Sequence, residues 1–310
     1  MRIYLEVEGV EKKLNYKKVI LVAAIIIAII ACIYIGIILP KLIEKQKINE
    51  QNANIEIAEN NETREDIDLD LIGISQEEIP SRAEEIYPII TPEGFDKIKN
   101  IYESDYKRVY LTFDDGPSQT VTTEVLKILD DYNIKATFFV LGSRVEIYPE
   151  IVKETYEKGH YVANHGYSHK YNHIYASIQN IIDEYRTTEN LIKNALGKDD
   201  YYSNVFRFPG GSPGGKYAKI KADAIPVLEE NNIAYLDWNC LNRDSEGNFS
   251  KEELIQFTKD TSFEKDSVVV LMHDAGTKIT TYEALPEIIE YFRDNGYVFE
   301  TLYDILEGDN

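Results

Sequence analysis

The sequence is poor in the residues on which several common kinds of protein depend. Its 310 residues include two cysteines, one tryptophan and two methionines. Cys32 lies inside an apolar run and Cys240 lies far along the polar remainder, so the two form no disulfide framework. No G-x-G-x-x-G or P-loop pattern occurs, which argues against a dinucleotide site and a phosphate-binding loop.

Positive charge is also scarce. Lys and Arg number 33 against 54 Asp and Glu, which gives a formal net charge of -21. This balance argues against nucleic acid as a partner, because phosphate binding needs clustered basic residues. It also argues against tight docking of the polar part on an anionic membrane surface. The chain is nonetheless long enough to bury a sizeable core.

One long apolar run stands near the start of the chain. Residues 19–40 are almost uninterrupted by charge, and lysines flank both ends with a modest excess before the run. About 20 helical residues span a bilayer, and cytoplasmic flanks tend to be basic. We therefore expect a single-pass membrane anchor, with residues 1–18 in the cytoplasm and the bulk of the chain outside the cell.

Two alternatives exist for this run. A cleaved signal peptide has a shorter apolar core of about 7–15 residues. A lipoprotein signal would use Cys32, but apolar residues rather than polar ones follow that cysteine. The length of the run favours a retained anchor over both.

The next segment differs in composition. In residues 41–104 acidic residues outnumber basic ones by more than two to one, and no long periodic apolar pattern appears. This composition is typical of a solvated linker, so we predict an acidic stalk. A short helix after about Pro92 would lead into a folded domain at 105–310.

From about residue 107, short runs of β-branched and aromatic residues alternate with helical patterns. The expected strands are 109–113, 136–140, 161–163, 205–208, 233–238, 268–271 and 298–302, and the clearest helices are 178–196, 217–230, 251–259 and 281–295. Such alternation predicts parallel strands joined by helices. About seven such units favour an α/β fold that forms a closed or nearly closed (β/α) barrel. A flat, doubly wound sheet is the alternative.

Five short polar motifs follow the expected strands. They are Thr-Phe-Asp-Asp-Gly-Pro at 112–117, His-Gly-Tyr-Ser-His at 165–169, Arg-Phe-Pro-Gly-Gly at 207–211, a Trp-to-Asp segment at 238–244 and Leu-Met-His-Asp at 271–274. In barrels of this kind, the active site lies at the carboxyl ends of the strands. We therefore expect these side chains to meet at one rim.

The second motif indicates a metal site. Two histidines and one carboxylate with an open fourth position are a common catalytic zinc set. His165 and His169 are four residues apart, so on a helical turn both rings would face one way, and Asp115 would supply the oxygen. The alternative is that the two histidines are an ordinary loop residue and a surface residue.

The neighbouring carboxylate suits a general base. Adjacent residues at a strand end point in different directions, so Asp115 can bind metal while Asp114 faces the attacking water. Arg207 could hold Asp114 ionised, and the backbone N–H groups around Gly210 could reach an oxyanion. A simple turn and an ordinary salt bridge are the alternatives.

His273 ends a buried strand and suits a general acid. An acidic side chain would orient it and raise its pKa, and Asp237, Asp244 and Asp274 are the candidates. Leu271 forms an apolar wall of a small pocket or belongs to the core.

Together these residues resemble the polysaccharide deacetylases of carbohydrate esterase family 4, also called the NodB homology domain. The resemblance covers about residues 105–308. It implies an α/β fold of the distorted (β/α)7–8 barrel type and an enzyme that removes acetyl groups from acetylated sugars. By motif match it also implies one role for each site residue: Asp114 is the base, His273 the acid, Asp115, His165 and His169 the metal ligands, Arg207 the partner of Asp114, Gly210 the oxyanion donor and Leu271 the pocket wall.

The fourth motif of this family often reads Trp, five intervening residues, then Asp-Trp. Trp238 and Asp244 have that spacing, which favours Asp244 as the partner of His273. Three positions depart from the family pattern. Gly166 replaces a hydroxyl residue that supports the histidine loop, and Gly210 and Ser245 stand where aromatics are common. We therefore expect a less rigid loop and a more open pocket.

These features predict a membrane-anchored, metal-dependent hydrolase with its catalytic domain outside the cell. The expected substrate is an N-acetylated glycan, first of all N-acetylglucosamine of peptidoglycan. Chitin oligomers, another exopolysaccharide and O-acetylated xylan are alternatives, and a non-catalytic wall-binding module is an alternative of another class. Zn²⁺ is the expected metal, although Co²⁺, Mn²⁺ and Ni²⁺ bind similar sets.

Overall fold

The computed structural model describes residues 90–306, so the expected anchor at 19–40 and residues 41–89 of the expected stalk lie outside the described residues. Between residues 90 and 306, no helix is both long and apolar enough to cross a membrane. The expected short helix near Pro92 is present as α3 (Pro92–Lys99), with Thr91 as its N-cap and Pro92 in the first turn.

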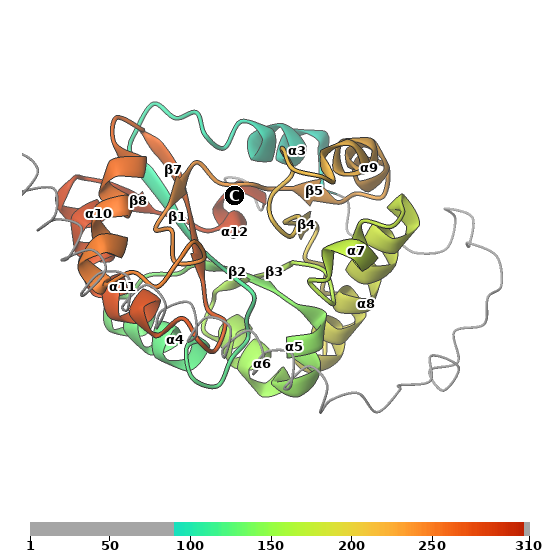
Figure 1. Ribbon diagram of the computed structural model, residues 1–310, viewed down its shortest axis with the longest axis horizontal. Coiled ribbons are helices and arrows are strands. Elements are labelled where there is room, and N and C mark those ends of the chain that lie inside the picture. Colours follow the sequence, from blue (N-terminus) through green and yellow to red (C-terminus); the bar gives the residue numbers. More distant parts are fainter. Residues whose placement is uncertain (1–89, 307–310) are drawn as a thin grey trace, which may run out of the picture. The chain divides into compact units, whose positions relative to one another are not determined.

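Eight parallel strands form one sheet (Figure 1). At its centre β1 (Arg108–Asp114) and β7 (Ser267–His273) pair along all their residues. The hydrogen-bonded order is β5-β4-β3-β2-β1-β7-β6. The remaining strands are β2 (Thr137–Val140), β3 (Tyr161–Asn164), β4 (Val205–Phe206), β5 (Ala234–Tyr235), β6 (Cys240–Leu241) and β8 (Val298–Phe299).

Helices surround this sheet on its outer side (Figure 1). They are α4 (Thr122–Asp131), α5 (Gly142–Ile147), α6 (Pro149–Glu157), α7 (Tyr171–Ile174), α8 (Ile178–Leu196), α9 (Ala218–Glu230), α10 (Lys251–Ser262) and α11 (Ile279–Asp294). A short α12 (Leu302–Leu306) follows β8. The helix predicted at 178–196 is confirmed, because Ser177 caps its start and Gly197, with φ of 64°, ends it.

The sheet is an incomplete barrel. Its order runs back from β5 to β1 and resumes at β7, as in a barrel, and does not reverse as a doubly wound sheet does. Within residues 90–306, the end strands β5 and β6 do not pair with each other. β8 adds a distortion, because it pairs with the start of β1 while β2 pairs with its end. The alternating pattern predicted a closed or nearly closed parallel barrel, and the structure confirms a parallel (β/α) barrel that is open between β5 and β6.

Successive side chains of the central strands point alternately to the apolar core and to the site. Val109, Leu111 and Phe113 point to the outer helices and belong to one large apolar cluster. The residues that alternate with them, Thr112 and Asp114 among them, face the other side of the sheet. Polar groups therefore reach the barrel interior at the carboxyl end of β1, while its outer face stays apolar.

Candidate active site

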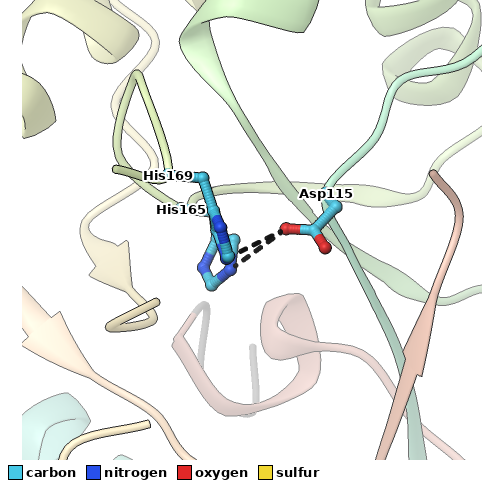
Figure 2. Close-up of side chains that lie close together, drawn as sticks. All are labelled: Asp115, His165 and His169. Carbon is cyan, nitrogen blue, oxygen red and sulfur yellow. Dashed lines mark ion pairs between the residues drawn. The ribbon is translucent and has the colours of Figure 1, made fainter. Parts of the chain in front are cut away.

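Three side chains from two loops meet beyond the ends of β1 and β3. Oδ1 of Asp115 lies 3.5 Å from Nε2 of His165 and 3.4 Å from Nε2 of His169 (Figure 2). That oxygen is buried and has no hydrogen-bond partner in residues 90–306. All three ligand atoms lie within 4.8 Å of one another. A buried, unpartnered carboxylate oxygen that faces two imidazole nitrogens fits one divalent metal ion.

The tautomer of His165 supports this fit. Its Nδ1 lies 2.8 Å from the carbonyl oxygen of Arg207, so Nδ1 carries the proton and Nε2 presents its lone pair to the cluster. Burial lowers the pKa of His165 to about 3, against the opposing charge of Asp115. The ring is therefore neutral, as a metal ligand must be.

The histidine loop is not helical, so the expected helical turn is wrong. Residues 165–170 form an irregular loop between β3 and α7, and positive φ angles at Gly166 (80°) and His169 (55°) curl it back. This curl brings the two ring centroids to 5.4 Å. The four-residue spacing is right for the cluster, but the loop and not a helix creates the proximity.

Glu184 of α8 supports this loop in place of the hydroxyl that Gly166 lacks. Its buried carboxylate accepts hydrogen bonds from the backbone N–H groups of Tyr167 (3.0 Å) and Ser168 (3.1 Å). It also accepts one from the Ser168 hydroxyl and lies 2.8 Å from Nδ1 of His173. A Cβ on residue 166 would stand 3.1 Å from this carboxylate. The expected loss of loop rigidity is therefore offset by a residue that no sequence motif pointed to.

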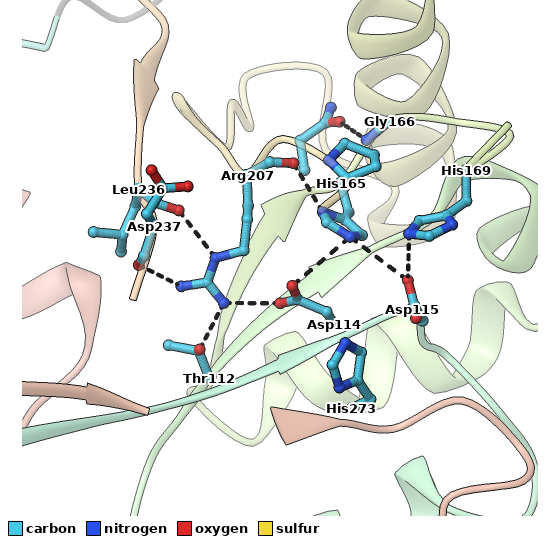
Figure 3. Close-up of polar contacts among 12 residues, drawn as sticks. Thr112, Asp114, Asp115, His165, Gly166, His169, Arg207, Leu236, Asp237 and His273 are labelled. Atoms are coloured by element: carbon cyan, nitrogen blue, oxygen red, sulfur yellow. Dashed lines mark hydrogen bonds and ion pairs between the residues drawn. The ribbon is translucent and has the colours of Figure 1, made fainter. Parts of the chain in front are cut away.

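Asp114 sits beside the cluster in a fully buried ion pair (Figure 3). Its Oδ1 accepts a 2.8 Å hydrogen bond from Arg207, whose guanidinium also donates to the Thr112 hydroxyl (2.7 Å). The carbonyls of Leu236 and Asp237 accept the remaining bonds, at 2.9 and 3.1 Å. Arg207 therefore has fixed partners on every side, which makes it a positioning group for Asp114.

The surroundings of Asp114 suit a base. Burial raises the pKa of its carboxyl, and the nearby charges of Arg207 and His273 oppose that rise. Its Oδ2 lies 3.7 Å from Nε2 of His165, at the edge of the metal cluster. Asp114 is thus a more basic carboxylate than an exposed one, and its ion pair with Arg207 favours the ionised form.

His273 pairs with Asp244. The imidazole Nδ1 lies 2.6 Å from Oδ1 of Asp244, and Oδ2 of the same carboxylate accepts the His273 backbone N–H (2.8 Å) and the Thr281 hydroxyl (2.7 Å). Burial lowers the pKa of His273, but the Asp244 hydrogen bond and charge outweigh it and raise that pKa to about 9. His273 is therefore a protonated donor at neutral pH, beside Asp114 and Asp115 (Figure 3).

The two other carboxylates weighed as partners of His273 lie elsewhere. Asp274 is buried against Gly116, where one oxygen accepts from the Thr122 hydroxyl at 2.6 Å. Asp237 accepts hydrogen bonds from both the N–H and the hydroxyl of Ser212. Residues 210–214, Gly-Gly-Ser-Pro-Gly, have the G-x-S-x-G spacing of a serine nucleophile. Within the described residues, however, Ser212 bonds Asp237 and no histidine, so it forms no serine triad.

The third motif forms a tight turn. The N–H of Gly211 donates to the carbonyl of Phe208 at 2.7 Å, with Pro209 second and Gly210, at φ of 76°, third in the turn. This is the residue pattern of a type II turn. The Gly210 N–H has no partner in the described part of the chain, which leaves it free to bind an oxyanion. Leu271 of β7 is 7% exposed and faces the same interior as His273.

His160 and Cys240 have structural surroundings. His160 is buried and accepts the Ala136 N–H at its Nδ1, 3.1 Å away. Cys240 is buried in the core, and burial raises the pKa of its thiol to about 11. Trp238, which lies beside the site at Gly211, is only half-buried.

An open parallel barrel with a metal-binding Asp-His-His cluster, a held base and a protonated acid defines a metal-dependent hydrolase. The sequence pattern of the polysaccharide deacetylase family matches residues 102–233. A peptidoglycan-N-acetylglucosamine deacetylase of Bacillus cereus is 32% identical over 204 residues, which cover 64% of this chain and 70% of that protein. The peptidoglycan-N-acetylglucosamine deacetylase PgdA of Listeria monocytogenes is 34% identical over 66% of this chain and 39% of its own length.

Solved structures agree. The catalytic domain of a peptidoglycan N-acetylglucosamine deacetylase from Eubacterium rectale superposes with a TM-score of 0.60 at 35% identity, over 66% of this chain and 91% of that one. A carbohydrate esterase family 4 enzyme of Streptococcus mutans gives 0.61 at 29% identity, over 66% and 90%. The chain belongs to the polysaccharide deacetylase family, carbohydrate esterase family 4, and is a hydrolase of that class. The family expected from the motifs is confirmed.

Proposed function

We propose that this enzyme removes the N-acetyl group from N-acetylglucosamine in peptidoglycan, with one divalent metal, first of all Zn²⁺, held by Asp115, His165 and His169. The observation that supports this chemistry is that a general base, Asp114, and a general acid, His273, both lie beside this cluster. Asp114 and His273 are directly paired in register across β1 and β7. The substrate choice is supported by the names of the Bacillus, Listeria and Eubacterium relatives.

The residues divide the reaction between them. Asp115, His165 and His169 would hold a divalent metal, which would supply a water of lowered pKa and a Lewis acid for the acetyl carbonyl. Asp114 takes the proton of the attacking water, since burial raises the pKa of this carboxylate and Arg207 fixes its orientation. The Gly210 N–H donates to the carbonyl oxygen as negative charge develops there.

The second half of the reaction belongs to His273. Its proton passes from Nε2 to the amide nitrogen as the C–N bond breaks, because Asp244 holds Nδ1 at 2.6 Å. The products are acetate and a free amino sugar. Asp244 touches no reacting atom and acts as a positioning and charge partner of His273.

Acetate release tests the proposal. Purified protein, freed of metal by a chelator and reloaded with Zn²⁺, Co²⁺, Mn²⁺ or Ni²⁺, would be incubated with peptidoglycan, chitin oligomers, another exopolysaccharide and acetylated xylan. We expect metal-dependent acetate release, fastest from peptidoglycan, and its loss in Asp114→Asn. Glycan binding without acetate release under every metal would instead indicate a wall-binding module. Faster release from another glycan would overturn the substrate assignment.

We also propose that residues 19–40 anchor the enzyme in the cell membrane with the catalytic domain outside. The support is the length of the apolar run and its basic flanks. Membrane fractions of cells that express the full chain should contain the protein at its full length. External protease should digest the catalytic domain in intact cells. A soluble, shortened product would show that the run is cleaved.

A further inference from the structure

An exposed tyrosine borders the metal cluster and has no part in the mechanism above. Tyr171 is the first residue of α7, directly after the histidine loop, and the residue is 40% exposed. Its ring centroid lies 5.4 Å from that of His169. A large aromatic surface therefore faces solvent next to the reaction centre.

The same ring occupies the space beside the oxyanion turn. A Cβ built on Gly210 would lie 2.6 Å from Oη of Tyr171 and 3.1 Å from its Cζ. Any side chain at position 210 would therefore collide with Tyr171. The pocket that the sequence led us to expect open at Gly210 is instead bordered by this ring, which comes from another motif.

Two further tyrosines hold the ring in place. The centroids of Tyr175 and Tyr217 lie 5.8 and 6.4 Å from that of Tyr171, both at steep interplanar angles. Tyr175 is buried, and its hydroxyl donates to the Pro209 carbonyl at 2.6 Å. This edge-to-face packing joins the wall to the oxyanion turn, so little ordering is needed on binding.

The hydroxyl of Tyr171 has no assigned use. It makes no hydrogen bond to any residue of 90–306, although it lies next to Gly210, the proposed oxyanion donor. Tyrosine in such a place combines an apolar face with a polar tip that binds a ligand. A sugar offers both matching surfaces, an apolar C–H face and ring hydroxyl groups.

We propose that Tyr171 is a substrate-contacting residue that determines glycan binding: its ring packs on the sugar that carries the acetamide, and its hydroxyl hydrogen bonds to that sugar. This role rests on the proposed deacetylation of a glycan at the same site. Because the contact is to the sugar and not to the acetyl group, it affects glycan substrates and spares small acetyl compounds.

The test compares Tyr171→Ala and Tyr171→Phe with wild type, each loaded with Zn²⁺. The substrates are an N-acetylglucosamine oligomer and a small acetyl ester. We expect Tyr171→Ala to lower kcat/KM on the oligomer at least tenfold, chiefly through KM, with turnover of the ester within about twofold of wild type. The kcat/KM of Tyr171→Phe on the oligomer should lie between those of wild type and Tyr171→Ala. Phe263→Ala, which removes a ring that is 70% exposed after α10, is the matched control and should match wild type.

Two results would overturn the role of Tyr171. Equal losses on oligomer and ester, or weaker Zn²⁺ binding by Tyr171→Ala, would show that Tyr171 only supports the His169 loop. An unchanged KM for the oligomer would show that the ring does not touch the sugar. If wild type releases no acetate from any glycan, the proposed function fails, and oligomer binding by calorimetry decides the role of Tyr171: weaker binding by Tyr171→Ala upholds it, and equal binding overturns it.

Discussion

Replacement of Asp244 by Asn should move the basic limb of the pH–rate profile. Asp244 is the partner that raises the pKa of His273 from 6.5 to about 9 despite burial. At about 1.4 kcal/mol per pKa unit, that rise corresponds to roughly 3 kcal/mol of preference for the imidazolium form. An asparagine keeps the size of the side chain but removes the charge, so most of this preference is lost.

The sign of the effect follows from the role of His273. A general acid must be protonated, so activity falls as pH rises through its pKa. A divalent cation at the cluster repels the imidazolium, so we expect the basic limb of the loaded wild type somewhat below pH 9. In Asp244→Asn the limb should lie at least one unit lower. The ratio of wild-type to variant kcat/KM should therefore grow toward high pH. It should reach about tenfold for each unit by which the pKa of His273 differs between the two proteins.

The assay is acetate release from an N-acetylglucosamine oligomer between pH 5 and 10. Thr281→Val is the control, because it removes another hydrogen bond to Asp244 but leaves its charge. Its basic limb should stay close to that of wild type. A profile for Asp244→Asn that is lowered equally at every pH would refute the reasoning, since Asp244 would then orient the ring without setting its pKa.

The same pair makes stability depend on pH. The folded-state pKa of His273 is raised, so its contribution is fully present below about pH 6.5 and is lost as pH rises through about 9. The free energy of unfolding of the metal-free wild type should therefore decline over this window, by at most roughly 3 kcal/mol. Urea unfolding of Asp244→Asn should show a flatter dependence.

Three further variants probe the other parts of the site. His165→Ala should weaken Zn²⁺ binding more than about a hundredfold in chelator competition, because changes outside the ligand set already cost about 10–100-fold. The control is His173→Ala, which should bind Zn²⁺ as wild type does, since the side chain of His173 is 61% exposed. Gly210→Ala should lower stability more than Gly214→Ala in thermal unfolding. Both positions have positive φ, but only at 210 would the new Cβ strike Tyr171. Equal losses of stability would therefore show that the contact with Tyr171 costs nothing. Arg207→Lys should cost about 2–5 kcal/mol in urea unfolding, since one ammonium cannot reach all the acceptors of a buried guanidinium; a loss below 1 kcal/mol would contradict this.

Much of the fold followed from patterns in the chain. The long strands β1 and β7 could be predicted because apolar and β-branched residues run without interruption over 109–113 and 268–272. The two-residue strands were less so: the expected strand at 233–238 is only Ala234–Tyr235, and β6 was not expected. Such short segments carry too few residues for a periodic signal, and their pairing depends on neighbouring strands.

The residues of the site also differ in how far the sequence predicted them. The identities of Asp114, Asp115 and the histidines were evident, because carboxylates and imidazoles after apolar strands are unusual. Their supports were not evident. Glu184 lies in the middle of an amphipathic helix, where a glutamate normally reads as a solvated residue, and only packing buries it under the histidine loop.

The amino-acid sequence alone determined which chemical groups this protein brings to a reaction and at which strand ends they stand, because strand periodicity is local. The tertiary structure confirmed Asp244, which the family's motif spacing favoured, as the partner of His273, and it alone showed that Tyr171 borders Gly210. Those contacts join residues far apart in the chain. Their distances depend on how strands and loops pack, which spacing along the chain does not encode.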